Sequence, residues 1–201
     1  MPIEPDTPRD QLLQLIKDLA IVHGRVTLSS GKEADYYVDL RRVTLHHRAA
    51  PLIGHVMLDR LEELGLGPGE VDAVGGLTLG ADPIAAALLH AAASRGLGLD
   101  AFVVRKATKA HGMQRRIEGP DIKGRRVIVV EDTTTTGGSP LEAIKACREA
   151  GAEVVAVATI VDRATGAAAA IEAQGVPYHP LFTLADVIGR SAPCDDILGL
   201  A

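Results

Sequence analysis

The sequence predicts an α/β fold, with a mainly parallel central sheet flanked by helices. From residue 71 onward, short apolar runs typical of buried strands alternate with segments of helical periodicity. Such alternation is typical of parallel sheets joined by right-handed crossovers. The 201 residues show no internal repeat and no linker. We therefore expect one domain over residues 1–201, in which about 1–45 form an N-terminal helix and hood and about 46–201 form the core.

The N-terminal part of the chain predicts one helix followed by a strand pair. Thr7 and Pro8 have the pattern of a helix cap and first turn, and apolar residues then recur at helical spacing until His23–Gly24. Residues 26–28 and 36–40 flank the polar segment SSGKEAD and predict two short paired strands.

The remaining elements alternate along the chain. Helices are predicted at residues 47–64, 83–94, 141–150 and 167–174, and strands at residues 71–74, 101–104, 127–130, 154–161 and 178–183. Four polar or glycine-rich segments, at 75–82, 105–112, 131–139 and 162–166, then follow strands. Because ligands of such sheets bind at the carboxyl ends of the strands, we expect these segments to converge on one site.

Composition excludes several classes of function. The formal net charge of −5 argues against a general nucleic-acid binder. The N-terminal segment is acidic and Pro-rich, and no apolar run approaches the roughly 18 residues of a membrane span. Cys147 and Cys194 are far apart and form no C-x-x-C pair, which suits a reducing compartment. We expect a soluble cytoplasmic protein without a membrane or nucleic-acid partner.

The segment VIVVEDTTTTGGSP, residues 127–140, carries most of the functional information. Four apolar β-formers predict a buried strand, and the acids Glu131 and Asp132 follow where that strand is expected to end. A turn of hydroxyl residues and glycines then leads into a helix, and such a turn presents free N–H groups and a helix dipole to a phosphate. The adjacent carboxylates suit a ligand that also carries hydroxyls, such as a phosphorylated ribose. The alternative is an ordinary strand-to-helix turn.

This segment resembles the motif of the type I phosphoribosyltransferases that binds 5-phosphoribosyl 1-diphosphate (PRPP). The resemblance implies that the acid pair binds the ribose hydroxyls and that the following loop surrounds the 5-phosphate. The PRPP-binding residues that it implies here are Glu131, Asp132, Thr133, Thr134, Thr135, Thr136, Gly137, Gly138 and Ser139.

The basic segment RKATKAHGMQRR, residues 105–116, contains five of the 21 Lys and Arg residues. A charge run is usually a solvated face, but a long loop at the ligand edge of a domain is often an active-site lid. It is similar to the R-K-x-x-K-x-H-G loop of orotate phosphoribosyltransferases. The resemblance implies that Arg105, Lys106, Lys109 and His111 bind PRPP, and that Lys106, Lys109 and His111 serve catalysis by stabilising the leaving diphosphate.

The resemblance extends to the base site. Arg163, in VDRATG, matches the arginine that binds orotate in these enzymes, and Thr135 matches a second orotate contact. A guanidinium suits a planar, carboxylate-bearing substrate because it donates two parallel hydrogen bonds. Tyr36 and Tyr37 match aromatic positions near the base, with core packing as the alternative for one of them.

Three positions, in two segments, depart from the family pattern. Some relatives carry a lysine where this chain has Ser29, and many place a Tyr-Lys pair where it has Leu79 and Gly80. Residues 75–85 otherwise match the diphosphate loop, whose glycines allow a close approach of the backbone to phosphate. The resemblance therefore implies backbone contacts from this loop and no lysine contact.

The resemblance implies an orotate phosphoribosyltransferase of bacterial type, which converts orotate and PRPP to orotidine 5′-monophosphate and diphosphate in UMP synthesis. It implies a Mg²⁺ requirement with no dedicated protein metal site, and a homodimer whose 105–116 loop is shared between subunits. Three alternatives stay open: a purine phosphoribosyltransferase, a PRPP-sensing regulator that binds RNA, and an inactive nucleotide-binding module.

Overall fold

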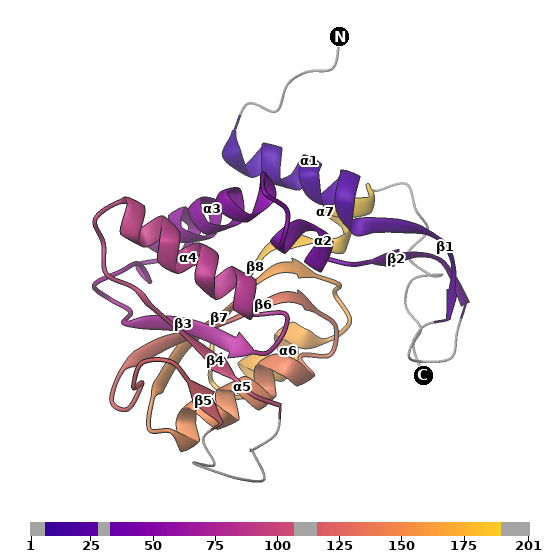
Figure 1. Ribbon diagram of the computed structural model, residues 1–201. Coiled ribbons are helices and arrows are strands. Elements are labelled where there is room, and N and C mark those ends of the chain that lie inside the picture. Colours follow the sequence, from indigo (N-terminus) through magenta and orange to yellow (C-terminus); the bar gives the residue numbers. More distant parts are fainter. Residues whose placement is uncertain (1–6, 28–32, 107–115, 190–201) are drawn as a thin grey trace.

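The computed structural model describes residues 7–27, 33–106 and 116–189, which contain two sheets (Figure 1). The larger has the strand order β5-β4-β3-β6-β7-β8. Its strands are β3 (Ala73–Leu77), β4 (Asp100–Val104), β5 (Ile117–Glu118), β6 (Arg126–Thr134), β7 (Glu153–Asp162) and β8 (Tyr178–Thr183). All neighbouring pairs are parallel except β4 and β5. The predicted α/β fold class is confirmed.

Helices cover both faces of this sheet. Helices α3 (Ala49–Glu63) and α4 (Asp82–Ser94) pack on one face, and α5 (Gly138–Glu149) and α6 (Ala167–Glu172) pack on the other. Side chains of β6 alternate between the two cores: Ile128 and Val130 join the first, while Val127 and Val129 join the second. All four are fully buried. Burial on both faces explains why this strand is a continuous apolar run in the sequence.

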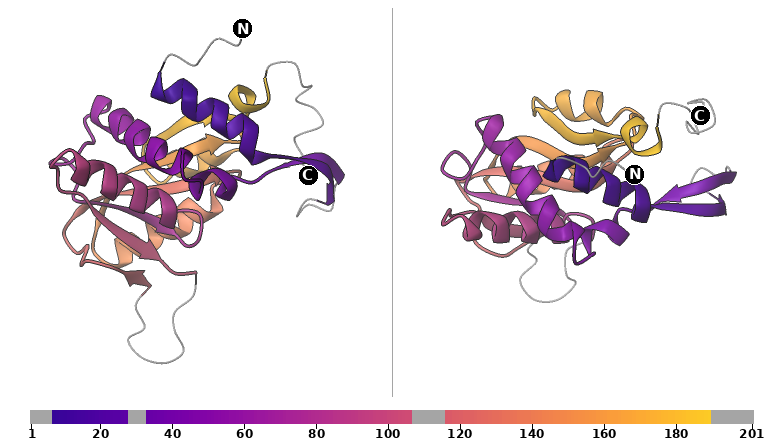
Figure 2. Two further views of the ribbon diagram at one scale, coloured as in Figure 1. Left: turned by 45° about the horizontal axis from the view of Figure 1, so that its top comes forward. Right: turned by 90° about the horizontal axis from the view of Figure 1, so that it is seen from above.

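The N-terminal residues form a smaller unit beside the sheet. Helix α1 (Pro8–Ala20) is capped by Thr7, whose hydroxyl accepts a hydrogen bond from the Asp10 N–H at 3.1 Å. The chain then enters β1 (Ile21–Thr27), which pairs antiparallel with β2 (Glu33–Val38). Figure 2 shows this two-stranded sheet extending beyond the body of the six-stranded sheet.

The predicted end of the first helix is wrong. The helix stops at Ala20, and His23–Gly24 lies inside β1 instead of terminating the helix. Ile21 already pairs with Val38, and Val22 pairs with Tyr37. Because β-branched side chains favour strands, this pairing prevails over the helical spacing of the preceding residues.

Two short helices were not predicted, because one turn leaves too little periodicity to detect. Helix α2 (Arg41–Thr44) follows β2 directly, and α7 (Leu184–Ile188) follows β8. A capping box fixes the start of α7: the Thr183 hydroxyl accepts from the Asp186 N–H, and the Asp186 carboxylate accepts from the Thr183 N–H.

Strand β3 extends further than the sequence suggested, and this changes the meaning of two glycines. The strand begins at Ala73 and continues through Gly75 and Gly76 to Leu77. A Cβ at Gly75 would lie 2.2 Å from the backbone oxygen of Phe102, and one at Gly76 would lie 2.3 Å from that of Val130. These glycines therefore allow close packing inside the sheet, and are not part of a phosphate loop as expected.

The strand order places a topological switch point between β3 and β6. From β3 the chain continues to β4 on one side, and from β6 it continues to β7 and β8 on the other. The loops after β3 and β6 therefore lead in opposite directions. This leaves a crevice at the carboxyl ends of these two strands, where ligands of such sheets bind. None of the helices in the described ranges is long and apolar enough to cross a membrane.

Candidate active site

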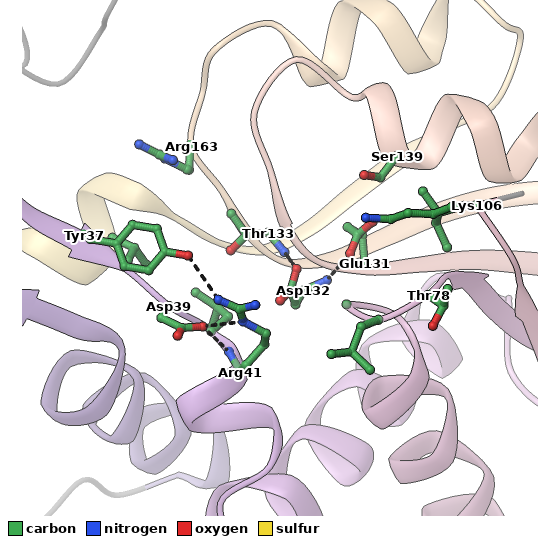
Figure 3. A pocket seen from close by; sticks show the side chains of 15 residues that line it. Tyr37, Asp39, Arg41, Thr78, Lys106, Glu131, Asp132, Thr133, Ser139 and Arg163 are labelled. Atoms are coloured by element: carbon green, nitrogen blue, oxygen red, sulfur yellow. Dashed lines mark hydrogen bonds and ion pairs between the residues drawn. The ribbon is translucent and has the colours of Figure 1, made fainter. Parts of the chain in front are cut away.

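A cleft of about 310 Å³ lies at this switch point (Figure 3). Segments far apart in the sequence line it: the end of the hood, the loop after β3, and residues that follow or end β4, β6 and β7. The lining residues are 37–41, 77–80, Lys106, 131–133, Ser139 and Arg163. The predicted convergence of the loops after strands on one site is confirmed for residues of all four segments.

The acid pair forms the floor of the cleft. Glu131 is 5% exposed, and burial, followed by the nearby charge of Asp132, raises the pKa of Glu131 to about 8. Burial also raises the pKa of Asp132. The Asp132 N–H donates to Glu131 Oε1 at 3.2 Å, and the Thr133 N–H donates to Asp132 Oδ1 at 2.6 Å. Near neutral pH this pair retains a proton, so it can both donate to and accept from ligand hydroxyls.

Both acids belong to β6, whereas the sequence suggested that the strand ends before them. The pairing continues because Glu131 lies opposite Thr159 and Thr134 lies opposite Asp162 on β7. The Thr159 hydroxyl donates to the backbone oxygen of Glu131 at 3.1 Å. The strand therefore holds the carboxylates rigidly, on a regular element instead of a loop.

The turn after β6 leads the start of a helix to the cleft. Gly137 is the N-cap of α5 and has φ 85°, a left-handed conformation that glycine adopts without strain. The helix begins at Gly138, before the expected position, and Ser139 in its first turn lines the cleft. The free N–H groups of a helix start and its dipole favour an anion here.

Arg163 follows β7 and lines the cleft, and Figure 3 shows it near Tyr37 of the hood, on the side away from Lys106. Its N–H donates to the backbone oxygen of Thr134 at 3.0 Å, which fixes the chain at this point. The Nε atom of Arg163 is buried and has no hydrogen-bond partner among the described residues. A buried donor without a partner is costly, so a ligand that accepts from Arg163 would relieve this cost.

The hood contributes a charged network that the sequence analysis did not single out. Arg41 Nε donates to Asp39 Oδ1 at 2.8 Å, and Arg41 Nη2 donates to the Tyr37 hydroxyl at 3.3 Å. The Arg41 charge holds the pKa of Asp39 below its ordinary value, through a side-chain hydrogen bond. The signal that could have revealed this network is the charged sequence DLRR directly after a strand.

The loop after β3 closes the opposite wall of the cleft. A cis peptide bond joins Thr78 and Leu79, and the Leu79 side chain is 59% exposed. The Thr78 hydroxyl donates to Asp82 Oδ2 at 2.7 Å. A Cβ at Gly80 would lie 2.2 Å from Glu131 Oε1, so no side chain fits between this loop and the acid pair.

Comparison with known proteins gives the family. Residues 42–173 match the phosphoribosyl transferase domain. Orotate phosphoribosyltransferase of Streptomyces avermitilis is 72% identical over 175 residues, which cover 87% of this chain and 93% of that protein. The chain belongs to the orotate phosphoribosyltransferase family. The enzyme of Corynebacterium glutamicum is 60% identical over 179 residues, 89% of this chain and 93% of that protein.

Solved structures of the family have the same fold. The orotate phosphoribosyltransferase of Mycobacterium tuberculosis in complex with Fe(III) dicitrate superposes with a TM-score of 0.81 at 58% identity, covering 90% of this chain and 99% of that one. The Mycobacterium tuberculosis enzyme in complex with PRPP gives a TM-score of 0.77 at 52% identity, with coverage of 90% and 99%.

The cleft brings together only part of the predicted orotate phosphoribosyltransferase site. Five of the residues predicted to bind PRPP line it, namely Lys106, Glu131, Asp132, Thr133 and Ser139, and so does Arg163, which was predicted to bind the base. Tyr37 also lines it. Lys109 and His111, predicted to contact the diphosphate, lie outside the described residues.

Other predicted residues face elsewhere. The hydroxyl of Thr134 is buried and hydrogen-bonds to Asp162 Oδ1 at 3.2 Å and to the Tyr178 hydroxyl, so its side chain supports the site from behind. Thr135, Thr136, Gly137 and Gly138 do not line the cleft, and both threonines are exposed. Arg105 Nη1 donates to Glu118 Oε1 at 3.2 Å, away from the cleft.

Proposed function

We propose that this protein transfers the ribose 5-phosphate of PRPP to orotate, giving orotidine 5′-monophosphate and diphosphate, a step of UMP synthesis. The observation that carries the proposal is one cleft that joins an acid pair with a buried Glu131, a helix start, and an arginine whose buried Nε has no hydrogen-bond partner among the described residues. These features match a ribose, a phosphate and an anionic base, and relatives 60–72% identical are orotate phosphoribosyltransferases.

The proposed roles follow from the chemistry of each group. Glu131 and Asp132 bind the ribose hydroxyls and stabilise the positive charge that develops on the ribose as the leaving group departs. The start of α5, with the turn of residues 133–139, binds the 5-phosphate. Arg163 binds the carboxylate and a carbonyl of orotate through its planar fork. Thr135 is exposed and does not line the cleft in the structure, and we propose that it makes a second orotate contact.

Negative charge develops on the diphosphate as it leaves the ribose, and positively charged side chains stabilise this charge. We propose that Lys106, Lys109 and His111 meet it, with Arg105 at the base of the loop, and that the protein is a homodimer in which each 105–116 loop reaches the partner's cleft. A closed loop excludes water and strengthens these electrostatic interactions. We propose that the active form is a homodimer in the cytoplasm.

Mg²⁺ fits the donor set of the cleft. The ion is usually held by one or two carboxylates together with substrate phosphates and water, and Glu131 and Asp132 provide such carboxylates. The described ranges contain no group of three or more His, Cys, Asp or Glu side chains placed to hold a metal. We propose that Mg²⁺ arrives bound to PRPP, and that it neutralises the diphosphate as it leaves.

The proposal is tested by following orotate absorbance with PRPP and Mg²⁺, beside hypoxanthine, guanine, adenine and uracil as control bases. We expect turnover of orotate alone. Turnover of a purine would replace the orotate assignment with a purine phosphoribosyltransferase. PRPP binding without turnover of any base would favour the inactive module or the regulator, and salt-dependent RNA binding would then identify the regulator.

A further inference from the structure

The hood places a positively charged side chain, Arg41, in the cleft, and the proposed function gives this side chain no role. Within the described ranges, the cations that line the cleft are Arg41, Lys106 and Arg163. Arg163 is assigned to the base, and Lys106 begins the loop at the far side of the acid pair. Arg41 lies on the near side, where Figure 3 shows its guanidinium beside Asp132.

Two side chains hold Arg41 in this orientation. Asp39 Oδ1 accepts from both the Arg41 backbone N–H, at 3.1 Å, and Arg41 Nε, at 2.8 Å. The Tyr37 hydroxyl accepts from Nη2 at 3.3 Å. A guanidinium has five N–H donors, so Asp39 and Tyr37 leave the two N–H groups of Nη1 without a hydrogen bond to a described residue.

Stability does not account for this arrangement. The Arg41 side chain is 49% exposed and that of Asp39 is 22% exposed. An ion pair this accessible to solvent adds little to the free energy of unfolding, because water screens it. What the contacts achieve is orientation: they fix a positive charge at the mouth of an anion-binding cleft.

The opposite wall of the cleft, formed by the loop after β3, lacks a positive charge that Arg41 can supply. A Cβ at Gly80 would lie 2.2 Å from Glu131 Oε1 and 2.9 Å from Asp132 Oδ1, so position 80 cannot carry a basic side chain. Leu79 is also uncharged. The side chains of the 77–80 loop therefore carry no positive charge, and the Thr78 hydroxyl already donates to Asp82 Oδ2 at 2.7 Å, so a positive charge must come from another element.

We infer that Arg41 contacts the diphosphate of PRPP directly, and that Asp39 is a positioning residue that orients it. The inference rests on the proposed function for the identity of the ligand. Its chemistry is specific: a polyanion that spans the space between Asp132 and the 77–80 loop accepts from Nη1, while the orotate carboxylate remains with Arg163.

The test measures PRPP affinity by titration calorimetry with Mg²⁺, and orotate KM at saturating PRPP, in the wild type and in Arg41→Gln. Losing a charge-assisted hydrogen bond should raise the PRPP Kd about 10- to 100-fold. Orotate KM should change by less than about 2-fold, because the substitution removes a contact to the diphosphate and none to orotate. The matched control is Arg42→Gln, an exposed neighbour on α2 that does not line the cleft, and its PRPP Kd should equal that of the wild type.

Asp39 provides a second, independent readout. Asp39→Asn should raise the PRPP Kd, and the double variant with Arg41→Gln should bind PRPP no more weakly than Arg41→Gln alone. Such non-additivity is expected when one residue acts only through the other. Additive losses would show that Asp39 does not act through Arg41.

The outcomes separate this inference from the proposed function. Turnover of orotate by the wild type, with normal PRPP affinity in Arg41→Gln, would overturn the inference alone. An equal loss in Arg42→Gln, or a selective rise in orotate KM, would overturn it too. If no base is turned over but Arg41→Gln loses PRPP affinity, the proposed function fails and the inference stands. No PRPP binding by the wild type would overturn both.

Discussion

Arg163→Lys isolates the fork geometry of the base contact from its charge. Lysine keeps the positive charge at this position but cannot donate two parallel hydrogen bonds to a carboxylate and its neighbour. One charge-assisted hydrogen bond contributes about 1.5–3 kcal/mol, and every 1.4 kcal/mol corresponds to a factor of about ten. We therefore expect kcat/KM for orotate to fall about 10- to 100-fold in Arg163→Lys, with the loss mainly in orotate KM.

The structure explains why the loss should be confined to the base. The backbone N–H of Arg163 donates to the Thr134 oxygen, and its buried Nε has no hydrogen-bond partner within the part of the chain that the structure describes. Initial-rate kinetics with each substrate varied in turn should show an unchanged KM for PRPP. Arg60→Lys is the matched control, since Arg60 pairs with Glu63 at 2.9 Å on the surface of α3. Equal effects of Arg163→Lys on both substrates would refute a role in binding the base.

Three further predictions concern the loop, the acid pair and the wall of the cleft. Lys109→Ala should lower kcat by about 10²–10³ with an unchanged Tm, as expected for loss of one transition-state donor. Glu131 has a pKa raised to about 8, so its contribution to stability is present below about 4.5 and is lost as pH rises toward 8. In the wild type, the free energy of unfolding should therefore decrease between pH 4.5 and 8, by at most about 1.4 kcal/mol per pH unit from this group. Glu131→Gln should remove this part of the pH dependence. Gly80→Ala should lower PRPP affinity because its Cβ would displace Glu131, whereas Gly98→Ala, in open space, should not.

Each of these predictions has an outcome that contradicts it. Near-normal turnover of Lys109→Ala with saturating substrates would remove Lys109 from the catalytic loop. A Tm that depends on pH between 4.5 and 8 as strongly in Glu131→Gln as in the wild type would show that Glu131 does not hold the proton. Wild-type PRPP affinity in Gly80→Ala would show that the wall and the acid pair are not in contact during binding.

The sequence was sufficient for the parts of the fold that depend on local pattern. The apolar run at residues 127–130 predicted a strand buried on both faces, and the alternation of strands and helices predicted a parallel sheet. The acid pair and Arg163 were found because their residue types are unusual at the ends of such strands. These features are visible in one dimension because each depends on residues that are neighbours in the chain.

Features that depend on contacts between distant segments were not visible. The buried role of Thr134 arises from Tyr178 and Asp162, which belong to two other strands. Phe102 and Val130 in the adjacent strands leave no room for a side chain at Gly75 and Gly76, and no local pattern reveals these neighbours. The Asp39–Arg41 pair itself is local, and the charged sequence DLRR could have indicated it. Its position at the cleft could not be predicted, because the cleft is completed by Asp132, which lies far away in the sequence.

The most direct test of the account is a crystal structure of the protein with orotidine 5′-monophosphate bound. The account predicts ribose hydroxyls within hydrogen-bond distance of the Glu131 and Asp132 carboxylates, the phosphate at the start of α5, and the pyrimidine carboxylate at Arg163. A nucleotide bound outside this cleft, or one whose base points away from Arg163, would contradict it.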